Sequence, residues 1–388
     1  MANTLTGLIP DLYAALDKVS RELTGYIPAV SHDLSGTQAA LNENITVHVA
    51  PTAAAADITP AMVLTEPADQ IIAPVSVAIT KSRSVPFAYT GEEQRGLNNG
   101  AGYLSVQANM MAQAMRTLVN EVEVDTALET ARTASRAYGV AGTTPFASTL
   151  DDIAEVKKIL KDNGAPMGDL QYVMDTSAGA ALYKLTQLTN VNEAGDEGLL
   201  RQGMIGARPL NGMSLRESGN SANLTGNAIV GTVTVTGANA IGATTINITT
   251  AAASSLTALK GDFIVFAGDT NKYVIAADVT IGASTTGDVI IAAPGLLIAT
   301  AGTEAVTGSA AFVANSAFDK GAIQLVTRAP AMPEEGDARI DSTVIQDPMS
   351  GLAFEVSVWA GQRKVRYEVA LAWGVKGIKP EHVVTNLG

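Results

Sequence analysis

The stretch that decides the fold is 103–137, YLSVQANMMAQAMRTLVNEVEVDTALETARTASRA, which contains neither glycine nor proline. Apolar residues recur there at alternating steps of four and three: Leu104, Ala108, Met111, Met115, Leu118 and Val122. This spacing predicts a helix of roughly 50 Å. The opposite face is mixed: Gln107, Asn109, Arg116, Glu121, Glu123 and Arg132. The heptad ends at Val122, which favours a helix laid across one or more sheets over a coiled-coil dimer.

The sequence before this helix predicts an arm and a long loop. Apolar residues at three- and four-residue steps indicate an amphipathic helix over 5–24. This helix either packs on its own domain or docks on a neighbouring subunit. Alternating strands at 45–49 and 71–81 are joined by an Ala/Pro/Asp-rich stretch, 50–70. A connection of this length predicts a protruding loop with a function.

The sequence after the helix predicts an α/β lobe. A helix is expected over 148–164, with Ser148 as its N-cap. A strand at Leu170–Met174 and a helix from Ser177 to about Leu188 follow. The segment 222–316 then has only seven charged residues in 95 and many short Val/Ile/Thr runs. It predicts a small all-β barrel or sandwich inserted into the lobe.

The C-terminal part predicts long antiparallel strands at Ala338–Gln346, Leu352–Trp359 and Val365–Trp373. Turn residues at 347–351 and 360–364 separate them. The expected fold class is therefore α+β.

The composition excludes several functions. Cysteine is absent, only three histidines are present and the net charge is −13. We therefore expect no disulfides, no thiolate or multi-histidine metal site and no protein built mainly to neutralise phosphates. No phosphate loop, nucleophile elbow or other catalytic motif is present, so we predict no catalytic residues, no metal and no cofactor. We also expect neither a signal peptide nor a membrane span.

Five stretches resemble the coat family of the short-tailed Salmonella phages, whose tailed-phage major capsid fold is shared with herpesviruses. The stretches are Lys81–Glu93, Gln171–Leu188, Gly203–Ser218, Phe318–Pro333 and Tyr367–Val384. They occur in the order of that family, and the resemblance extends over essentially the whole chain.

The resemblance implies an α+β capsid fold with an inserted β-barrel. It divides the chain into an N-terminal arm (1–48), an extended loop (49–81), a peripheral domain (82–144) with spine helix 103–137, an A domain (145–221), the insertion (222–316), the A-domain return (317–337) and peripheral strands (338–388).

The resemblance also implies a major capsid protein that assembles with itself into hexamers and pentamers around double-stranded DNA. The implied partners are a scaffolding protein, a portal protein and possibly a decoration protein, with no membrane. The implied location is the virion, after assembly in the cytoplasm of the host bacterium. We expect Asp11 and Asp17 to help dock the scaffold, and Glu66, Asp69 and Arg83 to contact the adjacent subunit through the extended loop. The alternatives are an exported surface-layer or adhesin-like protein and, third, an enzyme.

Overall fold

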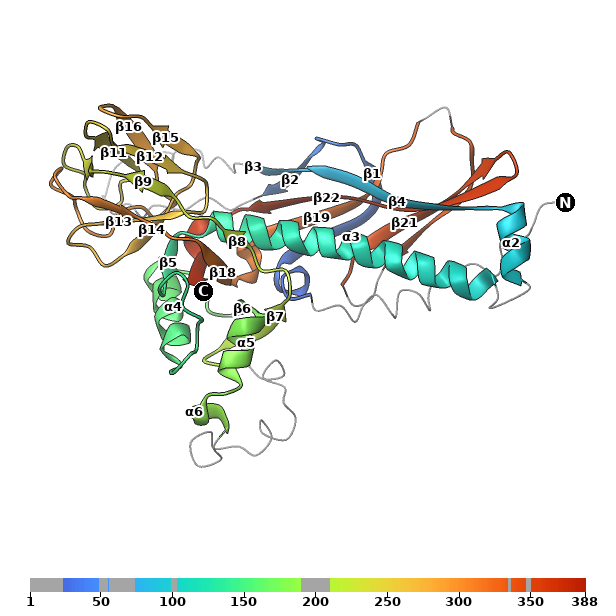
Figure 1. Ribbon diagram of the computed structural model, residues 1–388, viewed down its shortest axis with the longest axis horizontal. Helices are drawn as coiled ribbons and strands as arrows, with labels where there is room; N and C mark the ends of the chain where they lie inside the picture. Colours follow the sequence, from blue (N-terminus) through green and yellow to red (C-terminus); the bar gives the residue numbers. More distant parts are fainter. Residues whose placement is uncertain are drawn as a thin grey trace, which may run out of the picture.

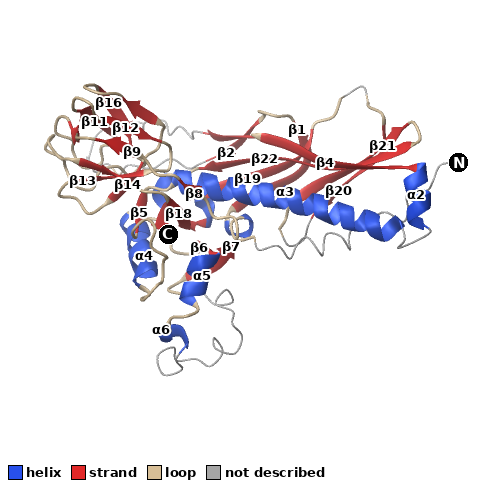
Figure 2. Ribbon diagram, viewed as in Figure 1, coloured by secondary structure: helices blue, strands red, loops and turns tan. Residues whose placement is uncertain are grey.

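The structure is a computed structural model that describes residues 24–48, 55, 74–98, 103–189, 210–333, 336–346 and 350–388. A long helix, α3 (Tyr103–Thr133), runs along one sheet and reaches a second lobe at its C-terminal end (Figure 1). Strands and helices share the described residues, with strands predominating, so the predicted α+β fold class is confirmed (Figure 2). Among these residues, we find no helix that combines the length and the apolar character needed to cross a membrane.

Helix α3 agrees with its predicted apolar stripe, because Met111, Met115, Leu118 and Val122 are all buried. The helix ends four residues before the predicted limit of 137. There the Ser135 amide donates to the Val383 carbonyl at 2.9 Å, and the chain continues as a strand, β5 (Arg136–Tyr138).

Six described strands form the sheet along which α3 lies. They are β1 (Ser31–Ala39), β4 (Lys81–Thr90), β19 (Ile323–Pro330), β20 (Arg339–Gln346), β21 (Ala353–Gly361) and β22 (Lys364–Gly377). Their order is β1-β19-β22-β21-β20, and β4 also pairs with β22. Strand β22 extends beyond the predicted end at Trp373 because its last residues pair with β19.

Nine described strands form the sheet of the second lobe, in the order β17-β13-β14-β5-β23-β18-β6-β7, with β8 beside β18. In addition to β5, they are β6 (Leu170–Asp175), β7 (Met213–Ser218), β8 (Asn223–Leu224), β13 (Phe263–Phe266), β14 (Lys272–Val274), β17 (Val306–Gly308), β18 (Phe312–Asp319) and β23 (Val383–Leu387). Three helices belong to this part of the chain: α4 (Asp151–Asp162), α5 (Thr176–Leu182) and α6 (Thr186–Thr189).

The segment predicted as an inserted barrel is all-β, and it is continuous with the nine-stranded sheet. Two three-stranded sheets surround its own hydrophobic cluster. One is β10 (Val233–Val235), β11 (Thr245–Thr250) and β16 (Thr286–Ile290); the other is β15 (Val279–Ile281), β12 (Ser255–Ala258) and β9 (Ala228–Val230). Strands β13, β14 and β17 instead extend the large sheet through β14–β5 pairing, which a self-contained barrel would not do.

Strand pairing does not follow two of the predicted domain boundaries, the end of the insertion at 316 and the A-domain return at 317–337. Strand β18 crosses the predicted end of the insertion at 316, because it pairs with both β23 and β6. Strand β19 was expected in the A-domain return, and it pairs with β1 and β22 of the six-stranded sheet instead.

Local signals account for smaller differences in the helices. Helix α4 begins at Asp151 and Ser148 does not cap it; the N-cap is Leu150, without a side-chain bond. The second predicted helix is divided into α5 and α6. The Asp175 side chain caps α5 by accepting from the Ser177 amide at 3.1 Å.

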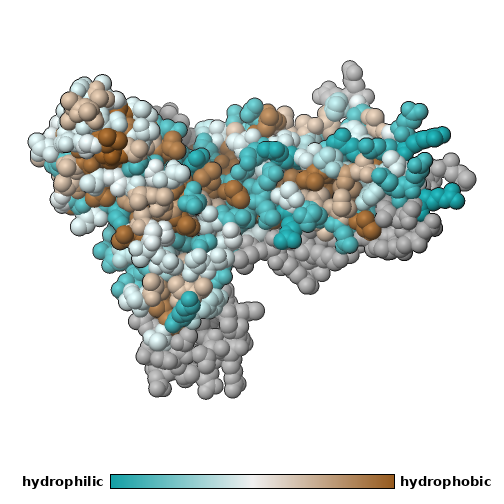
Figure 3. Space-filling model, viewed as in Figure 1, coloured by the Kyte–Doolittle hydropathy of each residue, from teal (hydrophilic) through white to brown (hydrophobic). Residues whose placement is uncertain are grey.

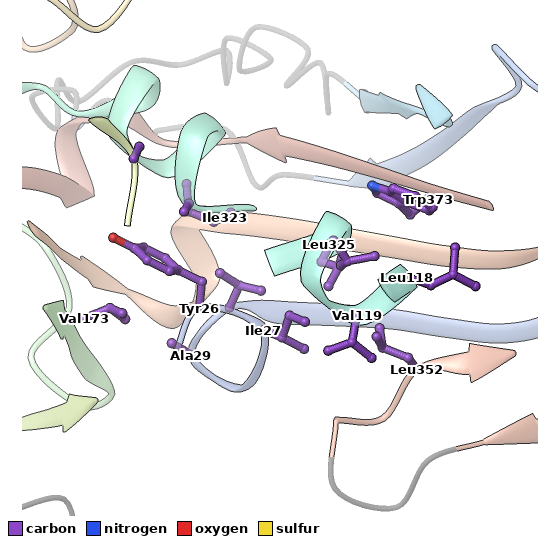
Figure 4. Packing of buried hydrophobic residues seen from close by; sticks show 14 of the residues in the cluster. Tyr26, Ile27, Ala29, Leu118, Val119, Val173, Ile323, Leu325, Leu352 and Trp373 are labelled. Carbon is purple, nitrogen blue, oxygen red and sulfur yellow. The ribbon is translucent and has the colours of Figure 1, made fainter. Parts of the chain in front are cut away.

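The principal core lies between α3 and the two large sheets (Figure 4). Trp373 of β22 and Leu325 of β19 contribute to it, as do Tyr26 and Ile27 from the short 3-10 segment η2 (Ile27–Ala29) and the residue before it. The same core thus joins Tyr26 and Ile27 to the long helix and to strands of both large sheets.

Candidate assembly surfaces

The described residues contain no group of three or more His, Cys, Asp or Glu side chains placed to hold a metal ion. An open groove of about 660 Å³ lies between residues 89–94 and 361–365. It is at the end of the six-stranded sheet that is remote from the second lobe, called the distal end below (Figure 1). The Thr90 hydroxyl in that groove is engaged in a helix cap, accepting from the Glu93 amide at 3.3 Å.

The distal end is built from the β4–α2 junction and the β21–β22 turn. Helix α2 (Gly91–Asn98) starts with a reciprocal capping box, in which Glu93 Oε2 also accepts from the Thr90 amide at 2.8 Å. The bond from the Thr90 amide lowers the pKa of the exposed Glu93, as do a side-chain hydrogen bond from Thr90 and the nearby charge of Lys364. Arg363 and Lys364 are exposed in the turn, and the hydrophilic end of the molecule is visible in Figure 3.

Of the five residues predicted to make contacts, the structure places Arg83. Its side chain is 59% exposed on β4, and its Nε lies 3.7 Å from Glu121 Oε2 on α3. Asp11, Asp17, Glu66 and Asp69 lie outside the described residues, as do residues 5–23 of the predicted helix 5–24 and most of the loop 50–70. Their contacts stay predictions.

The base of the predicted extended loop is an antiparallel pair, β2 (Asn44–His48) and β3 (Pro74–Ala78). The predicted strand 71–81 is interrupted after β3 because the chain changes partner. The Ile79 amide donates to the Glu43 carbonyl at 3.0 Å, whereas the Thr80 amide donates to the Trp373 carbonyl at 3.0 Å. The pair is also held to β22 by Lys376, whose Nζ donates to the Ser76 carbonyl at 2.8 Å.

Next to this base, a polar triad fixes strands β4 and β22 to the long helix. Asp125 of α3 accepts from Lys81 Nζ and from Trp373 Nε1, both at 2.8 Å. Lys81 Nζ also lies 5.9 Å from the centre of the Trp373 ring. Sequence reasoning missed this triad, because its members are 44 and 248 residues from Asp125 along the chain and carry no shared motif.

A buried arginine connects the all-β segment 222–316 to helix α4 of the second lobe. Arg136 Nη2 donates to the Asn163 side chain at 2.5 Å and to the Ile159 carbonyl at 3.3 Å, both at the C-terminal end of α4. Its Nη1 lies 3.4 Å from Asn271 Oδ1, next to β14. Burial lowers the pKa of Arg136, although nearby acidic groups oppose the shift. The helix C-terminus favours a cation, which accounts for the place of this charge.

Comparison with known proteins finds similarity in three dimensions only. The sequence matches no protein-family model and no curated protein. The chain is similar to a structure from Mycobacterium phage Che8, with 16% identity, a TM-score of 0.47 and coverage of 94% of this chain and 90% of that chain. It is also similar to the capsid structure of the cyanophage P-SCSP1u, with 10% identity, a TM-score of 0.49 and coverage of 95% and 88%. A virus-like particle from Pyrococcus furiosus has 11% identity, a TM-score of 0.43 and coverage of 98% and 99%.

Proposed function

We propose that this chain is a major capsid protein of a tailed phage, which assembles with itself into an icosahedral shell around double-stranded DNA. The observation that carries the proposal is the order of elements along the chain. The β2–β3 pair, the long helix α3, the α/β lobe with an all-β segment and the long strands β20 to β22 follow one another. The quoted sequence stretches imply the same order for a phage coat protein.

The chemistry of the surface supports an assembling protein. The described residues offer an open groove and exposed strands rather than a metal centre. Ile340 and Val344 are 56% and 46% exposed on β20, an edge strand of the six-stranded sheet. A shell subunit makes many modest contacts whose free energies add over several neighbours, so no single patch needs to be large. The net charge of −13 also suits a container that must release DNA.

Electron microscopy of the expressed protein tests the proposal. The expected result is closed shells of uniform diameter, either from the chain alone or with a scaffolding protein. Flat sheets would favour the surface-layer alternative. Monomers with a substrate-dependent activity would favour an enzyme, and either outcome would overturn the proposal.

The finer proposals concern partners and place of assembly. We propose that the chain belongs to the short-tailed Salmonella phage coat family and assembles in the bacterial cytoplasm with a scaffolding protein, a portal protein and, where one is present, a decoration protein. Asp11 and Asp17 would dock a basic segment of the scaffold. If Asp17→Ala particles contain the normal amount of scaffold, Asp17 has no part in docking.

The contact proposed for Glu66, Asp69 and Arg83 has a similar test. Arg83→Glu should slow assembly, measured by light scattering, without unfolding the monomer. The monomer is spared because the Arg83–Glu121 pair is exposed, so loss of the attraction and the new repulsion between two carboxylates each amount to at most about 1 kcal/mol. Lys161→Glu on α4 reverses another exposed charge and is the control. Equal assembly rates for wild type and Arg83→Glu would remove Arg83 from the interface.

A further inference from the structure

One buried carboxylate gathers four hydrogen-bond donors in the middle of the molecule. Glu123 of α3 is fully buried. Its Oε1 accepts from the amides of Gly25 and Tyr26 at 2.7 and 2.8 Å, and from the Ser218 hydroxyl at 2.7 Å. Its Oε2 accepts from the Ile27 amide at 2.9 Å. All four donors are neutral: three converge on Oε1 and one binds Oε2, so both carboxyl oxygens are engaged.

The four donors belong to parts of the chain that lead into different sheets. Residues 25–27 continue through η2 into β1, the edge strand of the six-stranded sheet. Ser218 is the last residue of β7, the edge strand of the nine-stranded sheet. Helix α3 packs against strands of both sheets, including β22 and β18. One side chain therefore ties the two sheets to the helix that they share.

The packing around the carboxylate leaves little room for these residues to move. A Cβ at Gly25 would lie 2.8 Å from both the Glu217 carbonyl oxygen and Val173 Cγ1. The fully buried Tyr26 donates from its hydroxyl to the Ala314 carbonyl at 3.3 Å. Figure 4 shows Tyr26 and Ile27 lying between the long helix and strands of both sheets. Residues 25–27 therefore fill the junction between the sheets.

We propose that Glu123 is a positioning residue that fixes the angle between the two sheets and thereby the curvature of the assembled shell. The part that concerns curvature rests on the proposed function. In a closed shell each subunit would contact its neighbours through both lobes. A change in the angle between the lobes would therefore change the orientation of one subunit relative to the next, and with it the curvature of the shell. Loss of one acceptor oxygen would leave buried amides unpaired and allow the sheets to move relative to each other.

The angle can be measured in the unassembled chain, independently of any shell. Because cysteine is absent from the sequence, two introduced cysteines can be spin-labelled without other changes. Lys161→Cys on α4 and Gln362→Cys in the β21–β22 turn place exposed labels in the two lobes. Pulsed electron paramagnetic resonance then gives the distribution of distances between them. We expect one narrow peak in wild type, and a broadened and shifted peak in Glu123→Gln.

Two further variants make the test decisive. Glu155→Gln makes the same change at a partly exposed carboxylate on α4 and should leave the peak unchanged. Ser218→Ala removes one donor and keeps the carboxylate, so it should broaden the peak less than Glu123→Gln. If Glu123→Gln does not fold, Ser218→Ala carries the test. An unchanged peak in every folded variant would overturn the positioning role.

Particle diameter separates this inference from the proposed function. If wild type forms uniform shells, we expect Glu123→Gln to form particles with a broader range of diameters, or open tubes, because the angle between the sheets is no longer fixed. A variant that is only less stable would instead give fewer particles of unchanged diameter. Uniform Glu123→Gln shells of wild-type diameter would overturn the curvature role. If wild type forms no shells at all, the proposed function fails, while the distance measurement still decides the positioning role.

Discussion

Gly374 of β22 gives a sharp test of how the predicted extended loop is held. A Cβ at this position would overlap the Ala78 carbonyl oxygen and lie 2.9 Å from the Ala78 carbonyl carbon. These are backbone atoms at the end of β3, so a rotamer change cannot relieve the overlap. Gly374→Ala therefore requires β3 to move away from β22 by roughly 1 Å.

The size of the effect follows from what that movement disturbs. Val77 and Ile79 are fully buried against the sheet, and the Thr80 amide is bonded to the Trp373 carbonyl at 3.0 Å. Overpacking costs about 1–3 kcal/mol and the weakened hydrogen bond about 1 kcal/mol. We therefore expect the free energy of opening the β2–β3 pair to fall by about 2–4 kcal/mol.

Amide hydrogen exchange measures this local free energy directly. A loss of 2 kcal/mol corresponds to about 30-fold faster exchange of the Ile45 and Val77 amides. Gly168→Ala is the control, because no atom lies within 4 Å of a Cβ there. Exchange within about twofold of wild type in Gly374→Ala would refute the reasoning, since 0.4 kcal/mol is less than any of the invoked costs.

Two other predictions concern the second lobe. Arg136→Ala removes the donor to the Asn163 side-chain oxygen and one of two donors to the Ile159 carbonyl, which keeps the bond from the Asn163 amide at 3.0 Å. Thermal unfolding should therefore show a loss of about 1–3 kcal/mol, and a loss below about 0.5 kcal/mol would contradict the proposed link. Burial raises the pKa of Asp152, against the effect of the hydrogen bond from the Phe146 amide. The folded-state pKa therefore exceeds the unfolded value, so this contribution to stability is complete below the unfolded pKa and is lost as the pH rises through the folded pKa. Denaturant midpoints should favour wild type over Asp152→Asn more at about pH 4 than at about pH 7, and a difference that is independent of pH would contradict this assignment.

The sequence by itself determined the elements whose signal is local. The three- and four-residue spacing of Met111, Met115 and Leu118 was enough for α3, because a helix repeats its buried face within a few residues. Strands β21 and β22 could likewise be predicted from alternating apolar residues such as Phe354 and Val369. The low charge and the short Val/Ile/Thr runs of 222–316 also indicated an all-β segment, which the structure contains, although strand pairing joins it to the nine-stranded sheet.

Tertiary structure alone decided the features that depend on distant partners. Strand β1 has no apolar alternation over its nine residues, and it forms through parallel pairing with β19 nearly 300 residues later. Glu123 looks like part of the mixed helix face in the sequence, yet it is buried. It can be buried because residues 25–27 and Ser218 supply its hydrogen bonds. The cost of burying a carboxylate is met only by groups that the fold brings to it, and their positions are not encoded near it in the chain.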